Sequence, residues 1–488
     1  MKFKKILSVA LSALICATGS TLVGCSDGEI KAFEKGTPKT SYKTTFRGID
    51  QDTMPISGYI GPSDSYQAQG YMLPSLVVDK TYKDLSAAGV NLIIEQRNPY
   101  NASSADASMD LLHRMLTHAG NNNISYLIKD TTAAYFDDGS EFVGSVEDMK
   151  TAIQRFYEYE SFAGFYFRDE PTAILMDKVG QAVDNFNTAI NELGYTDLQA
   201  YYNMLPPMGS SALYGGQAPT DLYPKGYTYE DYIQSFVNMS AGVNYLMFDQ
   251  YPIAGGKGEV ASNWFNTLGR MNSKAIANGL MWMGYAQVGG TYGFINNRFV
   301  DEYEYAWNIN SMLAFGAKGI GLYLLCMPPE YSLTVPEESV YEVGIINKYG
   351  NKTPMWYWTQ KITKNIFAMD HVLMNARHEG VIISGKSPCN YDNGTFVNNE
   401  YETPLLSNYR GLESVSGDPA LVGCFDYKGG MALLVMNNTF DDHRGEITLK
   451  FDEHYAYEVI QRGISAETDG EEFTLHLEAG EAALVVVK

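Results

Sequence analysis

Short apolar runs alternate with longer amphipathic segments from about residue 55 to residue 324. The short runs have the length of buried strands, and the longer segments repeat apolar residues at helical spacing. Several helical segments end in a glycine before the next strand, which is typical of a left-handed helix stop. These glycines are Gly89, Gly120, Gly194, Gly242, Gly279 and Gly316. The predicted strands are residues 56–60, 91–95, 125–129, 164–167, 199–203, 244–248, 280–285 and 319–324, and the predicted helices are 82–88, 107–119, 146–159, 173–193, 229–239, 264–278 and 301–315.

Eight strands, each but the last followed by a helix, match the count of a (β/α)8 TIM barrel. A doubly wound open sheet gives the same alternation of elements. The even spacing of the units and the lack of a Gly-rich phosphate loop after the first strand favour the barrel. Residues 353–369 predict a closing helix, with Trp356 and Trp358 packing it down. We therefore predict a barrel domain over residues 46–375.

Beyond residue 376 the pattern changes to short alternating runs separated by turn signals such as Asp469-Gly470. Runs of this kind predict antiparallel strands. Residues 376–488 are therefore predicted to form a small all-β sandwich domain. The predicted strands are residues 380–383, 421–426, 431–436, 445–451, 456–460, 472–477 and 482–487.

The N-terminus has the order of regions found in a signal peptide. Basic Lys2, Lys4 and Lys5 precede an apolar segment, residues 6–17, that is too short to span a bilayer. The sequence Leu22-Val23-Gly24-Cys25 resembles a bacterial lipobox, in which Cys25 is lipidated. The alternative is an ordinary signal peptide with an incidental cysteine. We expect a signal over residues 1–24, a polar tether over residues 25–45, and a protein anchored by lipid outside the cytoplasmic membrane.

Composition excludes several classes of protein. A net charge of −22 argues against a nucleic-acid partner, because no basic stripe is present to neutralise phosphates. Beyond Cys16 and Cys25, the cysteines show no metal-ligand spacing, and the seven histidines form no His-x-x-x-His pair. No metal and no cofactor are expected. A disulfide between Cys389 and Cys424 remains an open alternative.

One stretch carries the strongest chemical signal. The apolar run of residues 162–167 breaks abruptly into Arg168-Asp169-Glu170-Pro171. In a barrel, catalytic groups follow the carboxyl ends of the strands. Glu170 is therefore the first candidate for a catalytic acid, since a neighbouring hydrophobic strand raises the pKa of a carboxyl group. The structural alternative is a salt bridge from Glu170 to Arg168 or Lys129.

The ends of the other predicted strands add polar and aromatic side chains. Sugar hydroxyls exchange hydrogen bonds with polar groups, and the C–H face of a sugar ring lies on aromatic rings. We therefore expect a carbohydrate ligand, either as a substrate or in a non-catalytic glycan-binding barrel. The candidate substrate-binding residues are Glu95, Arg97, Lys129, Asp130, Arg168, Asn203, Tyr251, Trp282, Tyr285, Gln287 and Tyr323.

Three segments resemble the clan of (β/α)8 glycoside hydrolases that includes β-galactosidases and cellulases. Arg168-Asp169-Glu170-Pro171 is similar to the clan's Asn-Glu-Pro acid/base element, residues 314–320 resemble its passage into the eighth strand, and residues 475–487 resemble the last strands of its C-terminal sandwiches. The resemblance implies a surface glycoside hydrolase with a C-terminal sandwich. The clan's nucleophilic Glu ends the seventh strand, and Gln287 stands at that position here.

The second carboxyl group has two candidates, because glycoside hydrolysis usually needs a pair. Asp249 closes the sixth predicted strand, where it is either a base or nucleophile or a cap of the turn at Pro252. Asp169 is the other candidate, since adjacent Asp-Glu pairs occur in hexosaminidases that use the acetamido group of the substrate. Strand alternation aims Asp169 and Glu170 to opposite sides, which argues against that option unless the strand ends at Arg168.

Overall fold

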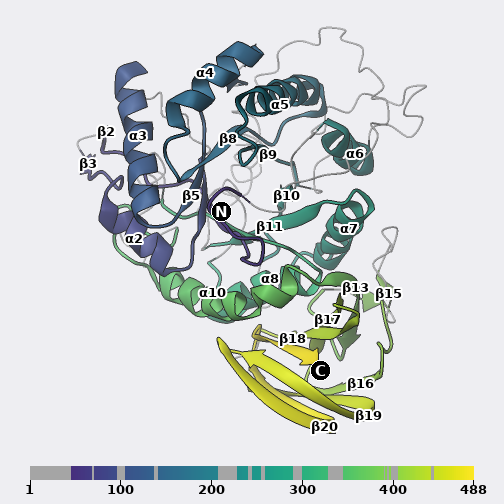
Figure 1. Ribbon diagram of the computed structural model, residues 1–488. Coiled ribbons are helices and arrows are strands. Elements are labelled where there is room, and N and C mark those ends of the chain that lie inside the picture. The colour runs from purple at the N-terminus through teal and green to yellow at the C-terminus, as the bar shows by residue number, and fades with distance from the viewer. Residues whose placement is uncertain are drawn as a thin grey trace, which may run out of the picture.

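The structure is a computed structural model. It describes residues 46–68, 71–95, 105–136, 141–206, 228–239, 245–253, 259–288, 299–327, 344–389, 391–392, 395–396, 405–440 and 444–488. The expected signal peptide and tether, together with Cys25, lie outside these residues. A ring of helices surrounds one sheet, and a second sheet lies beside this ring at the C-terminal end of the chain (Figure 1).

Eight parallel strands form the ringed sheet, each within a few residues of its predicted position. They are β1 (Ile56–Tyr59), β4 (Leu92–Ile94), β5 (Ser125–Ile128), β8 (Phe162–Asp169), β9 (Gln199–Asn203), β10 (Tyr245–Asp249), β11 (Met281–Gln287) and β12 (Ile320–Tyr323). Hydrogen bonds run in the order β10-β11-β12-β1-β4-β5-β8-β9. The end strands β9 and β10 meet through one bridge between Met204 and Phe248, where the Met204 N–H donates to the Met247 carbonyl at 2.9 Å. The sheet is thus a nearly closed barrel.

The predicted helices are present around the barrel. They are α2 (Asp79–Ala87), α3 (Ala105–Asn121), α4 (Val146–Phe156), α5 (Ala173–Leu193), α6 (Tyr229–Met239), α7 (Trp264–Ala277), α8 (Glu302–Ala314) and the closing helix α10 (Pro354–Leu373). Gly89, Gly194, Gly279 and Gly316 have the predicted left-handed backbone. Gly120 instead lies inside α3, and Gly242 lies outside the described residues. Among the described helices, none combines the length and the apolar character that crossing a bilayer requires.

Two short hairpins, which were not predicted, lie in loops that follow barrel strands. They are β2 (Tyr66–Ala68) with β3 (Tyr71–Leu73), and β6 (Ala134–Tyr135) with β7 (Phe142–Val143). The first follows β1 and the second follows β5, so both lie at the carboxyl ends of strands. Strands of two or three residues carry too little hydrophobic periodicity to be read from a sequence.

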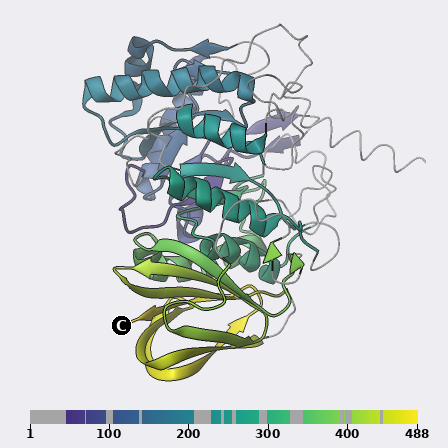
Figure 2. The ribbon, with the colours of Figure 1, turned by 90° about the vertical axis from the view of Figure 1, so that its right-hand side faces the viewer.

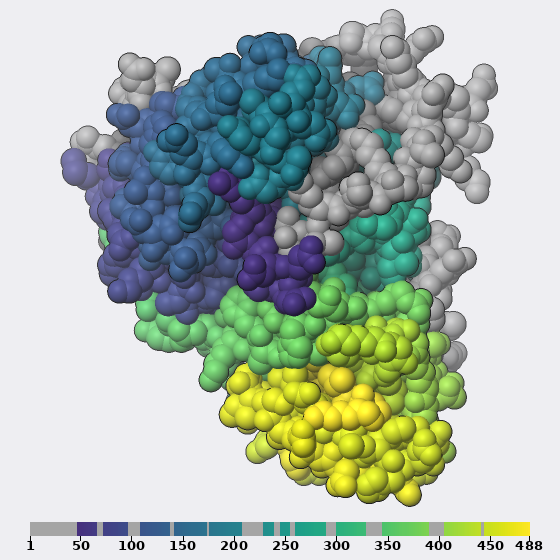
Figure 3. Space-filling view, viewed as in Figure 1, coloured from purple at the N-terminus to yellow at the C-terminus, as the bar shows by residue number. Residues whose placement is uncertain are grey.

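The N-terminal end of the described chain closes the floor of the barrel. Phe46 stacks on Tyr245 with ring centroids 5.4 Å apart and meets the edge of Tyr201 at 6.0 Å. Arg47 holds this segment in place through an ion pair of 3.0 Å to Asp197. The segment lies across the centre of the helix ring in Figures 1 and 3. Because the floor is filled by aromatic rings, a ligand reaches the lumen only from the opposite mouth.

Seven strands form the C-terminal domain, which is all-β as predicted. They are β13 (Arg377–Ser384), β16 (Leu412–Gly417), β17 (Ala420–Tyr427), β18 (Gly430–Asn437), β19 (Arg444–Gln461), β20 (Ile464–Glu478) and β21 (Ala482–Val487), and a separate hairpin joins β14 (Tyr391–Asp392) to β15 (Thr395–Phe396). The predicted strands 445–451 and 456–460 are one long strand, β19. The seven strands are hydrogen-bonded in one continuous sheet and not in two separate ones.

The two faces of this sheet have different partners. Val422, Leu433 and Val485 face a small core inside the domain, together with Ile447 and Leu449 of β19. Residues from the opposite face join the main core of the barrel; they include Leu421, Leu434, Met436 and Leu484. The domain therefore packs directly against α8 and α10, as the side view also shows (Figure 2).

A chain of buried hydrogen bonds crosses this junction. Trp282 Nε1 donates to Asn272 Oδ1 at 3.2 Å, and Asn272 Nδ2 lies 2.8 Å from His378 Nδ1. His378 Nε2 lies 3.1 Å from the carbonyl of Ala314, so this nitrogen carries the proton and Nδ1 accepts. Burial, the largest cause, and the nearby charge of Lys318 together lower the pKa of His378 to about 3. The neutral imidazole thus links β13 to α7 and α8.

The three cysteines among the described residues are structural. Cys326, Cys389 and Cys424 are free and buried. Burial raises the pKa of the Cys389 and Cys424 thiols far above the usual range, so neither is a reactive thiolate. No disulfide joins Cys389 to Cys424, and that alternative is wrong.

Candidate active site

Local irregularities in the fourth barrel strand bring two adjacent carboxyl groups to one place. The register of β8 against β9 shifts between Tyr166 and Arg168. Glu170, which follows the strand, has φ of 44°, in the left-handed region that non-glycine residues rarely enter. Its N–H donates to the Asn203 carbonyl at 3.0 Å. The expectation that alternation separates Asp169 from Glu170 is therefore wrong, because regular alternation is lost at this strand end.

Three carboxyl groups meet at the carboxyl ends of β8 and β10. Asn203 Nδ2, on the strand between them, donates to Asp169 Oδ1 at 3.3 Å and to Asp249 Oδ1 at 3.1 Å. The side chain of Glu170 is hydrogen-bonded to Asp249. Two carboxyl groups form a hydrogen bond with each other only when one of them is protonated. The Glu170–Asp249 pair therefore holds a single proton.

The proton is held near neutral pH. Burial, the largest cause, and the negative charge of Asp169 together raise the pKa of Asp249 to about 7. Hydrogen bonds with Glu170 and Asn203 act in the opposite direction. The sequence predicts a raised pKa for Glu170, which stays a prediction; the raised pKa of its partner, Asp249, was not predicted. All three carboxylic residues are only partly buried, so the cluster keeps contact with solvent.

Asp169 is held by donors from three strands. Tyr166 Oη donates to Asp169 Oδ1 at 3.0 Å, and the Tyr59 hydroxyl is also hydrogen-bonded to this carboxylate. The two tyrosine hydroxyls lie 3.3 Å apart. Together with the amide of Asn203, these donors fix Asp169 in place. Its contacts suit a residue that positions the site more than one that transfers a proton.

Aromatic rings line the cluster. Tyr251 and Tyr323 are partly buried with ring centroids 5.1 Å apart, and Tyr59 lies 5.9 Å from Tyr323. Tyr285 packs edge-on against Tyr59 at 5.2 Å. The sequence predicted three of these four tyrosines; Tyr59 was missed, as was Tyr166. Both missed residues lie at or near the ends of predicted strands, which was the available signal.

Two other predicted acids serve structural roles in the free protein. Glu95 is buried at the end of β4 and accepts a hydrogen bond of 2.9 Å from Tyr126. Asp130 is buried after β5, where it pairs with Arg155 at 3.1 Å and caps the turn at Thr132. The carboxylate of Asp130 therefore stabilises its own loop and is not available to bind a sugar.

The remaining predicted residues differ in burial and in the direction of their side chains. Lys129 is buried after β5 and Arg168 is partly buried near the end of β8. Gln287 is buried at the end of β11, where its N–H donates to Asn308 at 2.9 Å. The prediction for Trp282 is wrong: its side chain points out of the barrel, where Nε1 donates to Asn272 of α7. Arg97 lies outside the described residues.

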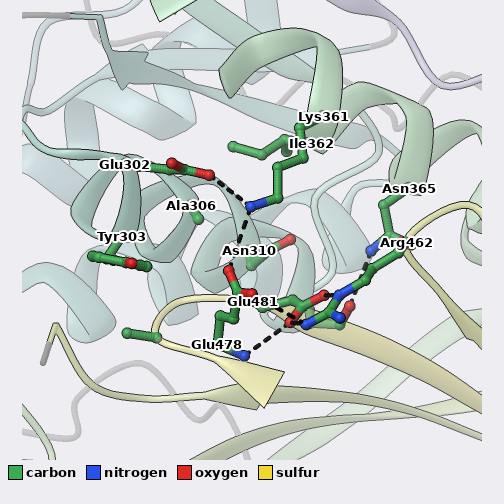
Figure 4. A pocket seen from close by; sticks show the side chains of 12 residues that line it. Glu302, Tyr303, Ala306, Asn310, Lys361, Ile362, Asn365, Arg462, Glu478 and Glu481 are labelled. Atoms are coloured by element: carbon green, nitrogen blue, oxygen red, sulfur yellow. Dashed lines mark hydrogen bonds and ion pairs between the residues drawn. The ribbon is translucent and has the colours of Figure 1, made fainter. Parts of the chain in front are cut away.

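A hollow at the junction of the two domains is a separate feature (Figure 4). Its volume of about 50 Å³ is far below the roughly 300–1,000 Å³ of ligand clefts. Its charged side chains are paired with each other: Lys361 with Glu302 at 2.6 Å, and Arg462 with Glu481 at 2.6 Å. Glu302 thus has a structural role, and the hollow lies where the two domains pack together. Within the described part of the chain, no group of acidic, His or Cys side chains has an arrangement that holds a metal ion.

Several solved structures that resemble this chain are glycoside hydrolases. A β-galactosidase from Bacillus circulans sp. alkalophilus shares 9% identity at a TM-score of 0.50, over 89% of this chain and 99% of that one. A β-L-arabinopyranosidase from Geobacillus stearothermophilus shares 9% at 0.44, over 90% and 99%, and a glycoside hydrolase from Bacteroides vulgatus shares 10% at 0.44, over 84% and 85%. No protein-family model and no curated protein matches this sequence. The likeness is one of fold: this chain has the barrel architecture found in glycoside hydrolases.

Proposed function

We propose that this protein is a glycoside hydrolase that cleaves an extracellular poly- or oligosaccharide, with Glu170 and Asp249 as its two carboxyl groups. The hydrogen bond between them carries the proposal. It joins the ends of the fourth and sixth barrel strands and holds one proton near neutral pH. Glycoside hydrolysis requires one protonated and one ionised carboxyl group at the same bond. A pair that shares a single proton supplies both forms.

In the proposed reaction Glu170 is the acid and Asp249 is the base. Glu170 gives its proton to the glycosidic oxygen as the bond from that oxygen to the anomeric carbon breaks. Asp249 takes a proton from a water molecule, whose oxygen bonds to the anomeric carbon. The cycle leaves Glu170 ionised and Asp249 protonated. The direct hydrogen bond then returns the proton to Glu170, and one water is consumed.

Neighbouring residues suit the binding of a sugar ring. Tyr251 and Tyr323 are partly exposed beside the pair and offer a surface for the C–H face of a sugar. Asp169 holds the tyrosines of β1 and β8 in place. The proposed base, Asp249, is on the sixth strand. The proposal therefore needs no carboxyl group at Gln287, the position where the resembling clan has its nucleophile.

Release of reducing sugar from plant, host and microbial glycans tests the proposal. Removal of an acid or base group is expected to lower the rate about 10²–10⁴-fold, so Glu170→Gln and Asp249→Asn are the test variants. Glu302→Gln is the matched control, because Glu302 makes an ion pair at the domain junction. Wild type and control should release sugar, while both test variants should lose release and keep glycan binding. Full activity in either test variant contradicts the assignment.

The alternative is a glycan-binding barrel without turnover. The direct contact of Glu170 with Asp249 favours it, because glycosidase carboxyl groups stand about 5–5.5 or 6.5–9.5 Å apart. This alternative predicts that no glycan is cleaved and that wild type and Glu170→Gln both bind glycan measurably.

We further propose that a lipid on Cys25 holds the protein outside the cytoplasmic membrane. The support is the order of basic, apolar and lipobox-like segments in residues 1–25. Metabolic labelling with an alkyne fatty acid should mark the wild type and leave Cys25→Ala unlabelled. Labelling of both proteins contradicts the proposal.

A further inference from the structure

The Tyr285 hydroxyl is an unusual group in this site. The residue is 1% exposed, and its hydroxyl has no hydrogen-bond partner among the described residues. Burying a hydroxyl without a partner costs folding free energy, whereas a phenylalanine fills the same space without that cost. The stability of the free protein therefore does not account for the hydroxyl.

Strand register places Tyr285 beside the carboxyl cluster. Tyr285 is opposite Asp249 on β10 and opposite Gly321 on β12. A β-carbon on Gly321 would lie 2.6 Å from the Tyr285 ring, so the glycine leaves the space across which the ring lies. Burial and the charges of Asp169 and Asp249 raise the pKa of Tyr285 well above its usual range. The side chain thus stays a neutral phenol, which is able to donate a hydrogen bond to a carboxylate.

In the free protein the two carboxyl groups are too close together for a substrate to lie between them. Glu170 and Asp249 are hydrogen-bonded to each other, which leaves no room for a glycosidic bond between them. When a sugar separates them, Asp249 keeps the amide of Asn203 and loses Glu170. An ionised carboxylate in this environment requires another donor, and Tyr285 is its neighbour on the next strand.

We infer that Tyr285 is a positioning residue whose hydroxyl takes the place of Glu170 as a donor to Asp249 when the site is loaded with a sugar. The inference rests on the proposed function. A hydrogen bond to the ionised form stabilises that form. Tyr285 thereby keeps Asp249 ionised in the complex, and the shared proton stays on Glu170, where the acid is needed.

Tyr285→Phe tests this inference, with Tyr305→Phe as the control. The Tyr305 hydroxyl is buried away from the site and paired at 3.0 Å with Thr359. Tyr285→Phe should melt at or above the wild-type temperature, and its kcat should fall about 10–100-fold. The acidic limb of kcat, which reports the enzyme–substrate complex, should move to higher pH, while the limb of kcat/KM, which reports the free enzyme, stays in place. Tyr305→Phe should melt lower and keep the wild-type pH profile.

The outcomes separate this inference from the proposed function. Wild-type kinetics in Tyr285→Phe overturn the inference and leave the hydrolase in place. A melting temperature well below wild type also overturns it, because the hydroxyl is then already paired in the free protein. If the wild type binds glycan without cleaving it, hydrolysis fails; calorimetry then supports the inference if Tyr285→Phe binds at least ten-fold more weakly and overturns it if binding is equal. A protein that neither cleaves nor binds glycan overturns both.

Discussion

Asn203 donates a hydrogen bond of 3.1 Å to Asp249, and the same nitrogen donates to Asp169 at 3.3 Å. This relationship follows from the barrel topology, because β9 lies between β8 and β10. Two carboxyl groups on either side of one strand repel each other when both are ionised. An amide donor between them keeps them close without a metal or a lysine.

Replacement of Asn203 by Ala should raise the pKa of Asp249 further. The carboxylate loses a donor, and the charge of Asp169 is no longer offset by a shared hydrogen bond. The acidic limb of the pH–rate profile should therefore move up by about one unit, with at least a ten-fold loss of rate below it. Asn185→Ala, which removes an amide on α5 that donates to the Gly144 carbonyl, is the control. An unmoved limb in Asn203→Ala would count against the role of Asn203.

Asp249 also makes stability depend on pH. Its pKa is raised from 3.8 to about 7, so the folded state binds its proton more tightly than the unfolded chain does. The free energy of unfolding should therefore fall as pH rises from about 4 to 7, by at most about 4 kcal/mol, since solvent screening lowers the effect. Asp249→Asn should remove this slope and be more stable than wild type above pH 7. Urea unfolding at several pH values measures it; an unchanged slope would refute the assignment.

His378 should make the domain junction sensitive to acid. Its pKa is lowered to about 3, so the unfolded chain takes up a proton below pH 6.5 that the folded chain does not. Stability should fall as pH drops from 6.5 towards 3, by about 2 kcal/mol at pH 5. His378→Gln should flatten this part of the curve and lose stability at neutral pH. Urea unfolding at pH 7.5 and pH 5 distinguishes the two proteins, and equal slopes would contradict the prediction.

Gly164 lies where the register of β8 against β5 shifts, and its backbone there is one that favours glycine. Its φ is 131°, and a β-carbon there would lie 1.8 Å from the Gln199 carbonyl oxygen. Gly164→Ala should therefore destabilise the protein by more than about 2 kcal/mol. Gly429→Ala is a control of similar backbone, since its φ is 83° and no atom lies within 4 Å of the added carbon. Thermal unfolding measures both losses. A smaller loss of stability in Gly164→Ala than in Gly429→Ala would contradict the prediction.

Periodicity was sufficient to predict the barrel. All eight strands and the helices between them lie within a few residues of their predicted positions, because buried parallel strands are continuous apolar runs bounded by glycine. The missed strand β16 shows the limit of this signal. Leu412 alone is buried in it, while most of its other residues are exposed. The long strand β19 was divided in two because its register shifts between Lys450 and Tyr455.

The candidate site was harder to predict than the fold. Strand ends correctly indicated that Glu170, Asn203 and Asp249 gather at one mouth. Which side chains share a proton depends on the left-handed backbone of Glu170 and on the irregularity before Arg168, and neither has a sequence pattern of its own. Trp282 was wrongly predicted to bind substrate, because the prediction considered which residues its strand contains and not which side of the strand each one faces. The side chain of Trp282 points outward, to Asn272.

The proton shared by Glu170 and Asp249 is the centre of this account. The most direct measurement is the rate of glycan hydrolysis by wild type, Glu170→Gln, Asp249→Asn and the double variant. Residues that act as a unit lose activity non-additively. Each single variant should be about 10²–10⁴-fold slower than wild type, and the double variant no slower than the slower single one. A single variant with wild-type rate, or losses that multiply in the double variant, would contradict the pair as one catalytic unit.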